Sequence, residues 1–327
     1  MNSVAISMKR VTVYILGASA LWCAVLPAKA SCGSAVCMVN TNWELQGVAM
    51  TPGWRLDMHF DFVRQNRLKS GGDTVAVGQV RRHHDEVSTT NRNLVATLDY
   101  THDAHWGVAV TLPRVDRAHE HIHNHGGGQI FERWDFARTG DVRIVGRYQL
   151  QPDPAAIPGG YSGINFGLKL PTGARNLRNA DGDLAERTLQ PGTGTTDLIL
   201  GGYWGGAPLR GDHSWFAQAL WQAPLADRDE YRPGRRVAAD LGYRYEAGSR
   251  VGLMMQLNAL YKGRDSGAQA EPGDSGGRFL FLSPGASLAV TRDLQVYGFV
   301  HIPVYQHVNG VQLVARHAFL AGVSMKF

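Results

Sequence analysis

The sequence predicts an all-β protein, a transmembrane antiparallel up-and-down β-barrel of about 12 strands. Three observations carry this prediction. Residues 1–30 have the make-up of an export signal. From residue 54 onward, apolar residues alternate with polar ones in one segment after another. The connections between these segments are long and short in turn, as long extracellular loops and short periplasmic turns are in such barrels.

Residues 1–30 are predicted to be a cleaved signal peptide. Lys9 and Arg10 form a basic start, residues 11–26 are mostly apolar, and Ala28-Lys29-Ala30 is a small-x-small cleavage site. The apolar run is too short and wrongly flanked for a spanning helix. Lipoprotein processing at Cys32 is an alternative. We therefore expect an exported protein that resides in the outer membrane of a Gram-negative bacterium.

Composition argues against a nucleic-acid partner. Removal of the three basic residues of the signal lowers the formal charge from +5 to +2, and an exported chain rarely meets nucleic acid. Past residue 30 no run of 18 apolar residues predicts a transmembrane helix. Glycine, at 39 of 327 residues, exceeds its usual share of about 7% and suits crowded lumens, turns and bends.

Residues 31–53 precede the first predicted strand and are too polar to span a membrane. The segment could cap the periplasmic mouth, enter the lumen as a small plug, or serve as a lead-in. It holds Cys32 and Cys37, for which an oxidising compartment favours a disulfide. A metal-handling pair of thiols is the alternative.

The barrel itself is predicted to span residues 54–327. In its first strand, apolar residues at even positions oppose Arg55, Asp57, His59 and Asp61. Similar alternation predicts strands at 94–100, 106–112, 142–150, 164–170, 237–246, 251–261, 294–304 and 315–327. Three strands of blurred parity complete the set, at 196–205, 213–222 and 278–290.

The connections support the same topology. Long or moderate ones are expected at 66–92, 117–138, 171–195, 223–235, 263–277 and 306–313. Short ones are expected at 102–105, 152–160, 206–212, 247–249 and 291–293. With both termini in the periplasm, the long ones fall outside the cell. Aromatic residues near strand ends, such as Trp54 and Trp106, are typical of interfacial girdles.

Charged residues recur at the parity that faces the lumen. They are Arg55, Asp57, Asp61, Asp99, Asp141, Arg143, Arg147, Lys169, Asp240, Arg244 and Glu246. An Arg or Lys on the lipid face at mid-membrane would cost ~2–4 kcal/mol, so their consistent parity is topological evidence. Two interpretations follow: a pore lining that selects by charge, or an ion-pair network that fills a narrow barrel.

A histidine tract in the 117–138 connection is the sharpest local feature. His119, His121, His123 and His125 alternate within it, and His83 and His84 lie in another long connection. Neutral imidazole suits zinc, copper or nickel, so metal contact is one interpretation. The others are a solvated polar loop, histidines packed against neighbouring loops, or a pH-sensitive loop. No HExxH spacing is present, and no cofactor is required.

The last strand ends on an aromatic residue. Phe319, Ala321, Val323 and Met325 share one parity with Phe327. This ending is similar to the C-terminal signature of bacterial outer-membrane barrels. Phe327 is therefore a predicted assembly signal, with the barrel assembly machinery and outer-membrane lipid as partners.

Two Gly-rich segments carry a family resemblance. Leu170-Pro171-Thr172-Gly173 ends one strand, and residues 192–197 (GTGTTD) open the next. Together with residues 91–113, they resemble the outer-membrane family named for the meta-pathway of phenol degradation. The resemblance covers roughly residues 54–327 and implies a barrel that passes small, often hydrophobic, compounds. It supplies no catalytic residues.

The function expected from the sequence is a non-enzymatic channel or transporter for a small solute, either a hydrophobic or aromatic compound or a metal ion. A metal-binding or sensing barrel is the alternative. A barrel-wall lipid hydrolase is less favoured, because adjacent His213 and Ser214 would point to opposite faces of a strand and no Asn-His-Ser set stands out.

Overall fold

The computed structural model describes residues 41, 52–80, 85–125, 128–150, 160–206 and 211–327. The predicted signal 1–30, nearly all of 31–53, both cysteines Cys32 and Cys37, and His83 and His84 lie outside these residues. The expectations for them therefore stay predictions. No helix in the described part of the chain is long and apolar enough to cross a membrane.

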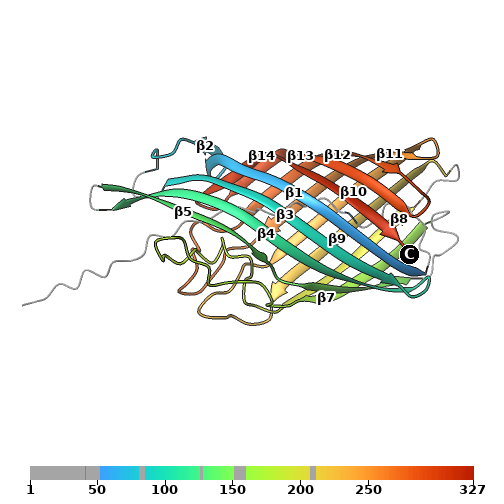
Figure 1. The fold of residues 1–327 in the computed structure, drawn as a ribbon, viewed down its shortest axis with the longest axis horizontal. Helices are drawn as coiled ribbons and strands as arrows, with labels where there is room; N and C mark the ends of the chain where they lie inside the picture. Colours follow the sequence, from blue (N-terminus) through green and yellow to red (C-terminus); the bar gives the residue numbers. More distant parts are fainter. Residues whose placement is uncertain (1–40, 42–51, 81–84, 126–127, 151–159, 207–210) are drawn as a thin grey trace, which may run out of the picture.

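Twelve strands close into one antiparallel barrel (Figure 1). They are β1 (Gly53–Ser70), β3 (Asp85–Thr101), β4 (Trp106–His125), β6 (Arg143–Leu150), β7 (Gly160–Lys169), β8 (Asp197–Gly206), β9 (His213–Pro224), β10 (Arg236–Ala247), β11 (Val251–Lys262), β12 (Gly277–Ala289), β13 (Leu294–Val308) and β14 (Val311–Lys326). Each pairs with the next, and β14 pairs with β1, with Met58 opposite Val323. The predicted fold class is confirmed.

The two ends of the barrel differ. We call the end that holds Trp54 and Phe327 the terminal end, where their backbones exchange hydrogen bonds of 2.9 and 3.0 Å. We call the opposite end the loop end, where the irregular connections gather in Figure 1. Aromatic side chains on the outside mark the terminal end. The ring centroids of Trp54 and Tyr100 are 4.6 Å apart, and those of Trp106 and Tyr148 are 4.7 Å apart.

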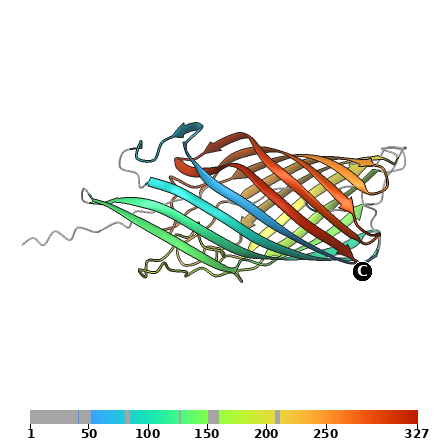
Figure 2. The same ribbon diagram turned by 45° about the horizontal axis from the view of Figure 1, so that its top comes forward.

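A β-hairpin replaces the predicted long connection 117–138. β4 pairs with β6 only over Trp106–Thr111 and then continues, pairing from Arg114 onward with β5 (Gly128–Thr139). Figure 2 shows these green strands extending past the rim at the loop end. The prediction of a loop was wrong. Beyond Leu112 the outward side chains are no longer consistently apolar, but the alternating histidines keep the two-residue period of a strand.

Two other predicted connections are shorter than expected. β13 ends at Val308 and β14 begins at Val311, so the 306–313 connection shrinks to a tight turn with Gly310 at a φ of +62°. β1 runs on to Ser70 and pairs there with the short strand β2 (Asp73–Val75). Backbone pairing therefore extends the strands beyond the apolar pattern at the loop end.

Candidate functional site: the lumen and its cap

Bulky side chains on the inner wall lie over glycines of the neighbouring strand. Phe216 on β9 is directly opposite Gly242 on β10, and a Cβ added to Gly242 would collide with the Phe216 ring. The same relation joins Tyr203 to Gly163, Tyr161 to Gly205, Phe299 to Gly285 and Tyr297 to Gly322. The rings therefore lie along the wall. Glycine is needed opposite each ring because any larger side chain would collide with it, which explains part of the high glycine content.

These rings form apolar clusters inside the barrel. One joins Tyr203 and Phe216, each 2% exposed, with Tyr161 beside them. A second joins Met254, Tyr297, Phe299 and Leu320. A third, Leu260, Phe279, Val308 and Val314, lies further along β11–β14 toward the loop end. The inner wall is therefore amphipathic, with apolar clusters among polar groups.

Most of the charged residues expected in the lumen have partners. Arg147 is 2.7 Å from Asp99, and Arg244 is 2.5 Å from Glu246. Asp57 accepts a hydrogen bond of 2.8 Å from the hydroxyl of Tyr297. The remaining contacts are Arg55 with Ser324, Asp61 with His59 and Asp240 with Asn258, while Arg143 is half-buried. This arrangement favours the ion-pair and hydrogen-bond network over a lining of free charges.

A serine, a histidine and an asparagine meet in the lumen, which the sequence did not indicate. Ser283 Oγ donates to Asn258 Oδ1 at 2.8 Å and lies 2.8 Å from His301 Nδ1. Because the serine proton is directed to the asparagine, the imidazole is not placed to take it as a general base. We interpret the group as part of the polar network. Its members come from β11, β12 and β13, so only the folded register brings them together.

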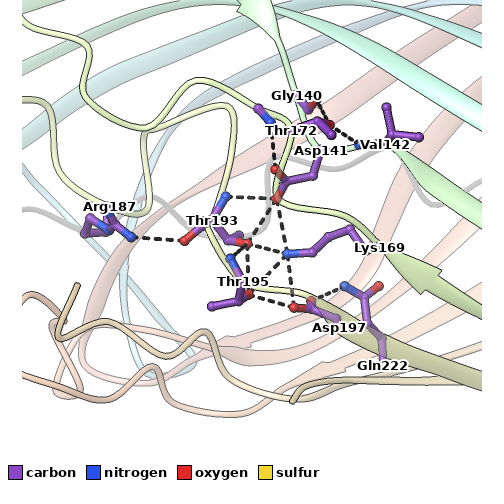
Figure 3. Close-up of polar contacts among 11 residues, drawn as sticks. Gly140, Asp141, Val142, Lys169, Thr172, Arg187, Thr193, Thr195, Asp197 and Gln222 are labelled. Atoms are coloured by element: carbon purple, nitrogen blue, oxygen red, sulfur yellow. Dashed lines mark hydrogen bonds and ion pairs between the residues drawn. The ribbon is translucent and has the colours of Figure 1, made fainter. Parts of the chain in front are cut away.

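A buried lysine holds the ends of the 171–195 loop to the wall (Figure 3). Lys169 Nζ lies 3.1 Å from Asp141 Oδ2 and 3.1 Å from Asp197 Oδ1. Asp141 also accepts the backbone N–H groups of Gly173, at 3.0 Å, and Thr193, at 2.9 Å. The LPTG and GTGTTD segments therefore act together as one anchor, which we call the lysine anchor.

A second anchor is built on Asp265, which is 1% exposed. Its carboxylate accepts hydrogen bonds from Tyr231 (3.1 Å), the Gly234 backbone (2.7 Å) and Lys262 (3.1 Å). Burial raises the pKa of Tyr231 well above its usual value, and the nearby Asp265 charge adds to the shift. This anchor joins the loops 225–235 and 263–276.

The two anchors belong to one connected structure. Arg175 pairs with Asp229, and the Arg187 guanidinium lies 5.0 Å from the centroid of the Tyr231 ring. Loops 171–195, 225–235 and 263–276 thus form a cap at the loop end, held by buried carboxylates.

The histidine tract is only partly a surface feature. His119 and His121 are 0% and 1% exposed on the inner face of the β4–β5 hairpin. One proton arrangement satisfies a chain of contacts: Thr89 to His119 Nδ1 at 2.8 Å, His119 Nε2 to His121 Nδ1 at 3.1 Å, and His121 Nε2 to Glu132 at 2.9 Å. These ring nitrogens are used within the protein.

Among the residues that the structure describes, no group of three or more His, Cys, Asp or Glu side chains could hold a metal ion. The side chains of His123 and His125 lie outside that part, as His83 and His84 do. Zinc, copper or nickel contact by the six predicted histidines therefore stays a prediction.

No family model matches the chain, and no curated protein matches it. Among solved structures, an outer-membrane channel from Pseudomonas putida F1 superposes with a TM-score of 0.63 at 12% identity, over 86% of this chain and 97% of that one. The transport unit of the autotransporter AIDA-I from Escherichia coli gives a TM-score of 0.48 at 9% identity, over 90% and 94%. NanC porin gives 0.46 at 10% identity, over 83% and 100%. The first likeness establishes the fold, that of an outer-membrane β-barrel.

Proposed function

We propose that the protein is an outer-membrane channel for small solutes with an apolar or aromatic part. The observation that carries this proposal is the inner wall, where five aromatic side chains lie flat over glycines, each directly opposite its partner. A barrel stabilised only by charge pairs has no need of such surfaces. Four of these rings are only 2–6% exposed and Tyr161 is half-buried. A solute would therefore stack on the wall as the lumen side chains that cover the rings move aside.

The charge network supports the same proposal. Paired carboxylates and guanidinium groups, such as Arg147 with Asp99, present dipoles rather than net charge to a passing solute. The wall would therefore hold one polar end of an amphipathic solute while a ring holds its apolar end. Metal ions fit this wall less well, because most of the charged groups on it are already engaged in ion pairs or hydrogen bonds.

The location and route of assembly belong to the same proposal. The predicted signal at residues 1–30 would direct export, and the exposed apolar outer face of the strands suits lipid. Phe327 would be read by the barrel assembly machinery. The resemblance to the phenol meta-pathway family supports the choice of an aromatic cargo.

Swelling of proteoliposomes tests the proposal. The refolded protein should admit benzoate faster than a pentose of similar mass, and protein-free liposomes supply the baseline. Uptake of neither solute, with protein whose gel mobility shifts on heating as a folded barrel's does, would overturn the proposal. Equal uptake of both solutes would keep a channel but remove the aromatic preference.

A further inference from the structure

Exposed arginines stand on the outside of the barrel just beyond its apolar band. Arg64, Arg92 and Arg114 are exposed and share the outward parity of their strands β1, β3 and β4. Each follows the last apolar outward position toward the loop end. Arg64 lies two residues beyond Phe62, Arg92 two before Leu94 and Arg114 two beyond Leu112.

The three side chains are neighbours across adjacent strands. Arg92 is directly opposite Phe62, and Arg114 is directly opposite Leu94, so the arginines are staggered by two positions from strand to strand. Residues staggered by two positions on neighbouring strands are about 7–8 Å apart. Long guanidinium side chains at this diagonal spacing can reach a shared anionic group in adjacent pairs, Arg64 with Arg92 and Arg92 with Arg114.

Two of the three have no carboxylate to neutralise them. Arg92 lies 3.3 Å from Asp116, an exposed pair of the kind that contributes little to stability. Within the described part of the chain, neither Arg64 nor Arg114 has an ion-pair partner. Their charge is therefore available to a molecule outside the barrel.

The opposite rim of the same strands is different. At the terminal end, β1, β3 and β4 carry Trp54, Tyr100 and Trp106 at the outer surface. Aromatic rings suit either membrane interface, whereas guanidinium groups bind phosphate in a bidentate manner. The outer surface of these three strands is therefore asymmetric, with aromatic rings at the level of one leaflet and guanidinium groups at the level of the other.

We propose that Arg64, Arg92 and Arg114 form a binding site for the phosphate groups of an anionic glycolipid in the outer leaflet. Membrane depth favours a lipid headgroup over a soluble anion, because the arginines adjoin apolar side chains that contact acyl chains. This inference rests on the outer-membrane location in the proposed function, and it does not depend on whether the barrel conducts.

The test uses the full refolded protein in detergent micelles, with bisphosphorylated lipid A as the probe. Each basic residue near an anionic surface contributes ~1 kcal/mol, about fivefold in affinity. The double variant Arg64→Gln/Arg114→Gln should therefore bind lipid A about 25-fold more weakly. Its matched control is Arg250→Gln/Arg292→Gln, which removes two exposed arginines from turns at the terminal end and should leave the affinity unchanged.

The proposal would be overturned by equal loss in both double variants, by no loss in either, or by undiminished binding of lipid A from which the phosphates have been removed. Competition by millimolar inorganic phosphate to the same extent as by lipid A would make the site a general anion site and would also contradict it. If Arg64→Gln/Arg114→Gln fails to fold, Arg114→Lys supplies the answer, because it keeps the charge, loses the bidentate geometry and should still weaken binding. Conductance measured after the same preparations are reconstituted into planar bilayers separates a failure here from a failure of the channel proposal.

Discussion

The ring of Phe216 lies against Gly242, the residue directly opposite it on the neighbouring strand. The glycine leaves the space that the ring occupies, and the ring covers the backbone that the glycine exposes. Because four more aromatic residues repeat this relation, it organises the inner wall of the barrel. A change of one methyl group at such a glycine tests what the relation contributes.

Gly242→Ala should displace the Phe216 ring toward the barrel axis. Overpacking of this kind costs ~1–3 kcal/mol, so the urea midpoint of the refolded barrel should fall and benzoate uptake should slow. The matched control is Gly202→Ala, where the nearest atom to an added Cβ, the carbonyl oxygen of Gly163, is 3.6 Å away. Equal effects of the two substitutions would show that the ring contact has no special part in the lumen.

Lys169→Met should release the 171–195 loop. It leaves the buried Asp141 and Asp197 carboxylates without their shared cation, a change that costs ~3–5 kcal/mol. Arg92→Gln breaks an exposed pair and should cost ~0–1 kcal/mol. Urea unfolding measures both, and limited proteolysis should cut within the loop only in the Lys169 variant. An intact loop in that variant would argue against the lysine anchor.

Tyr231 should make the stability of the cap depend on alkaline pH. Burial holds its folded pKa above the usual value of 10.0, so the unfolded chain ionises first as the pH rises. This contribution to the free energy of unfolding is complete below about pH 10 and declines above it. The wild type should therefore lose more stability between pH 9 and 11 than Tyr231→Phe, which has no hydroxyl to ionise. Parallel pH curves for the two proteins would contradict the assignment.

At pH 7 the same substitution isolates the hydrogen bond to Asp265. Its loss should lower the free energy of unfolding by ~1.5–3 kcal/mol, the range for a bond to a charged group. Tyr305→Phe is a suitable control, because the Tyr305 side chain is half exposed on the outside of the barrel.

Deletion of Phe327 should impair insertion while leaving secretion intact. The deletion removes two backbone hydrogen bonds to Trp54 where β14 meets β1, as well as the predicted assembly signal. Fractionation of cells should then find the truncated chain in the periplasm. Phe327→Tyr keeps both the backbone bonds and an aromatic ring and should insert normally; normal insertion of the truncated chain would refute the signal.

Alternation along the strands was enough to predict the barrel. The outward side chains suit contact with lipid, as those of Leu94, Leu98, Val108 and Val110 show. An apolar residue at every second position marks this face within one strand, so no knowledge of the neighbouring strands is needed. The three strands of blurred parity include Tyr203, Phe216 and Gly285, each of which fits the size of the residue opposite it on the neighbouring strand. Large and small residues there are chosen by this cross-strand fit, which the sequence of one strand does not reveal.

The residues of the site meet partners that are distant in sequence, so the sequence alone did not predict their contacts. Lys169 meets Asp141 and Asp197 from 28 residues away on either side, and Ser283 meets His301 through the register of two strands. His119 and His121 suggested a metal, whereas the structure uses their nitrogens in a buried chain that ends at Glu132. Residue type predicted polarity at these positions but not the partner.

Planar-bilayer recording tests the central claim, an aromatic-lined channel, most directly. The refolded wild type should give discrete current steps that benzoate blocks reversibly, and Phe216→Ala should conduct with weaker block. Silent bilayers from folded protein would contradict the account, as would steps that benzoate blocks equally in both proteins.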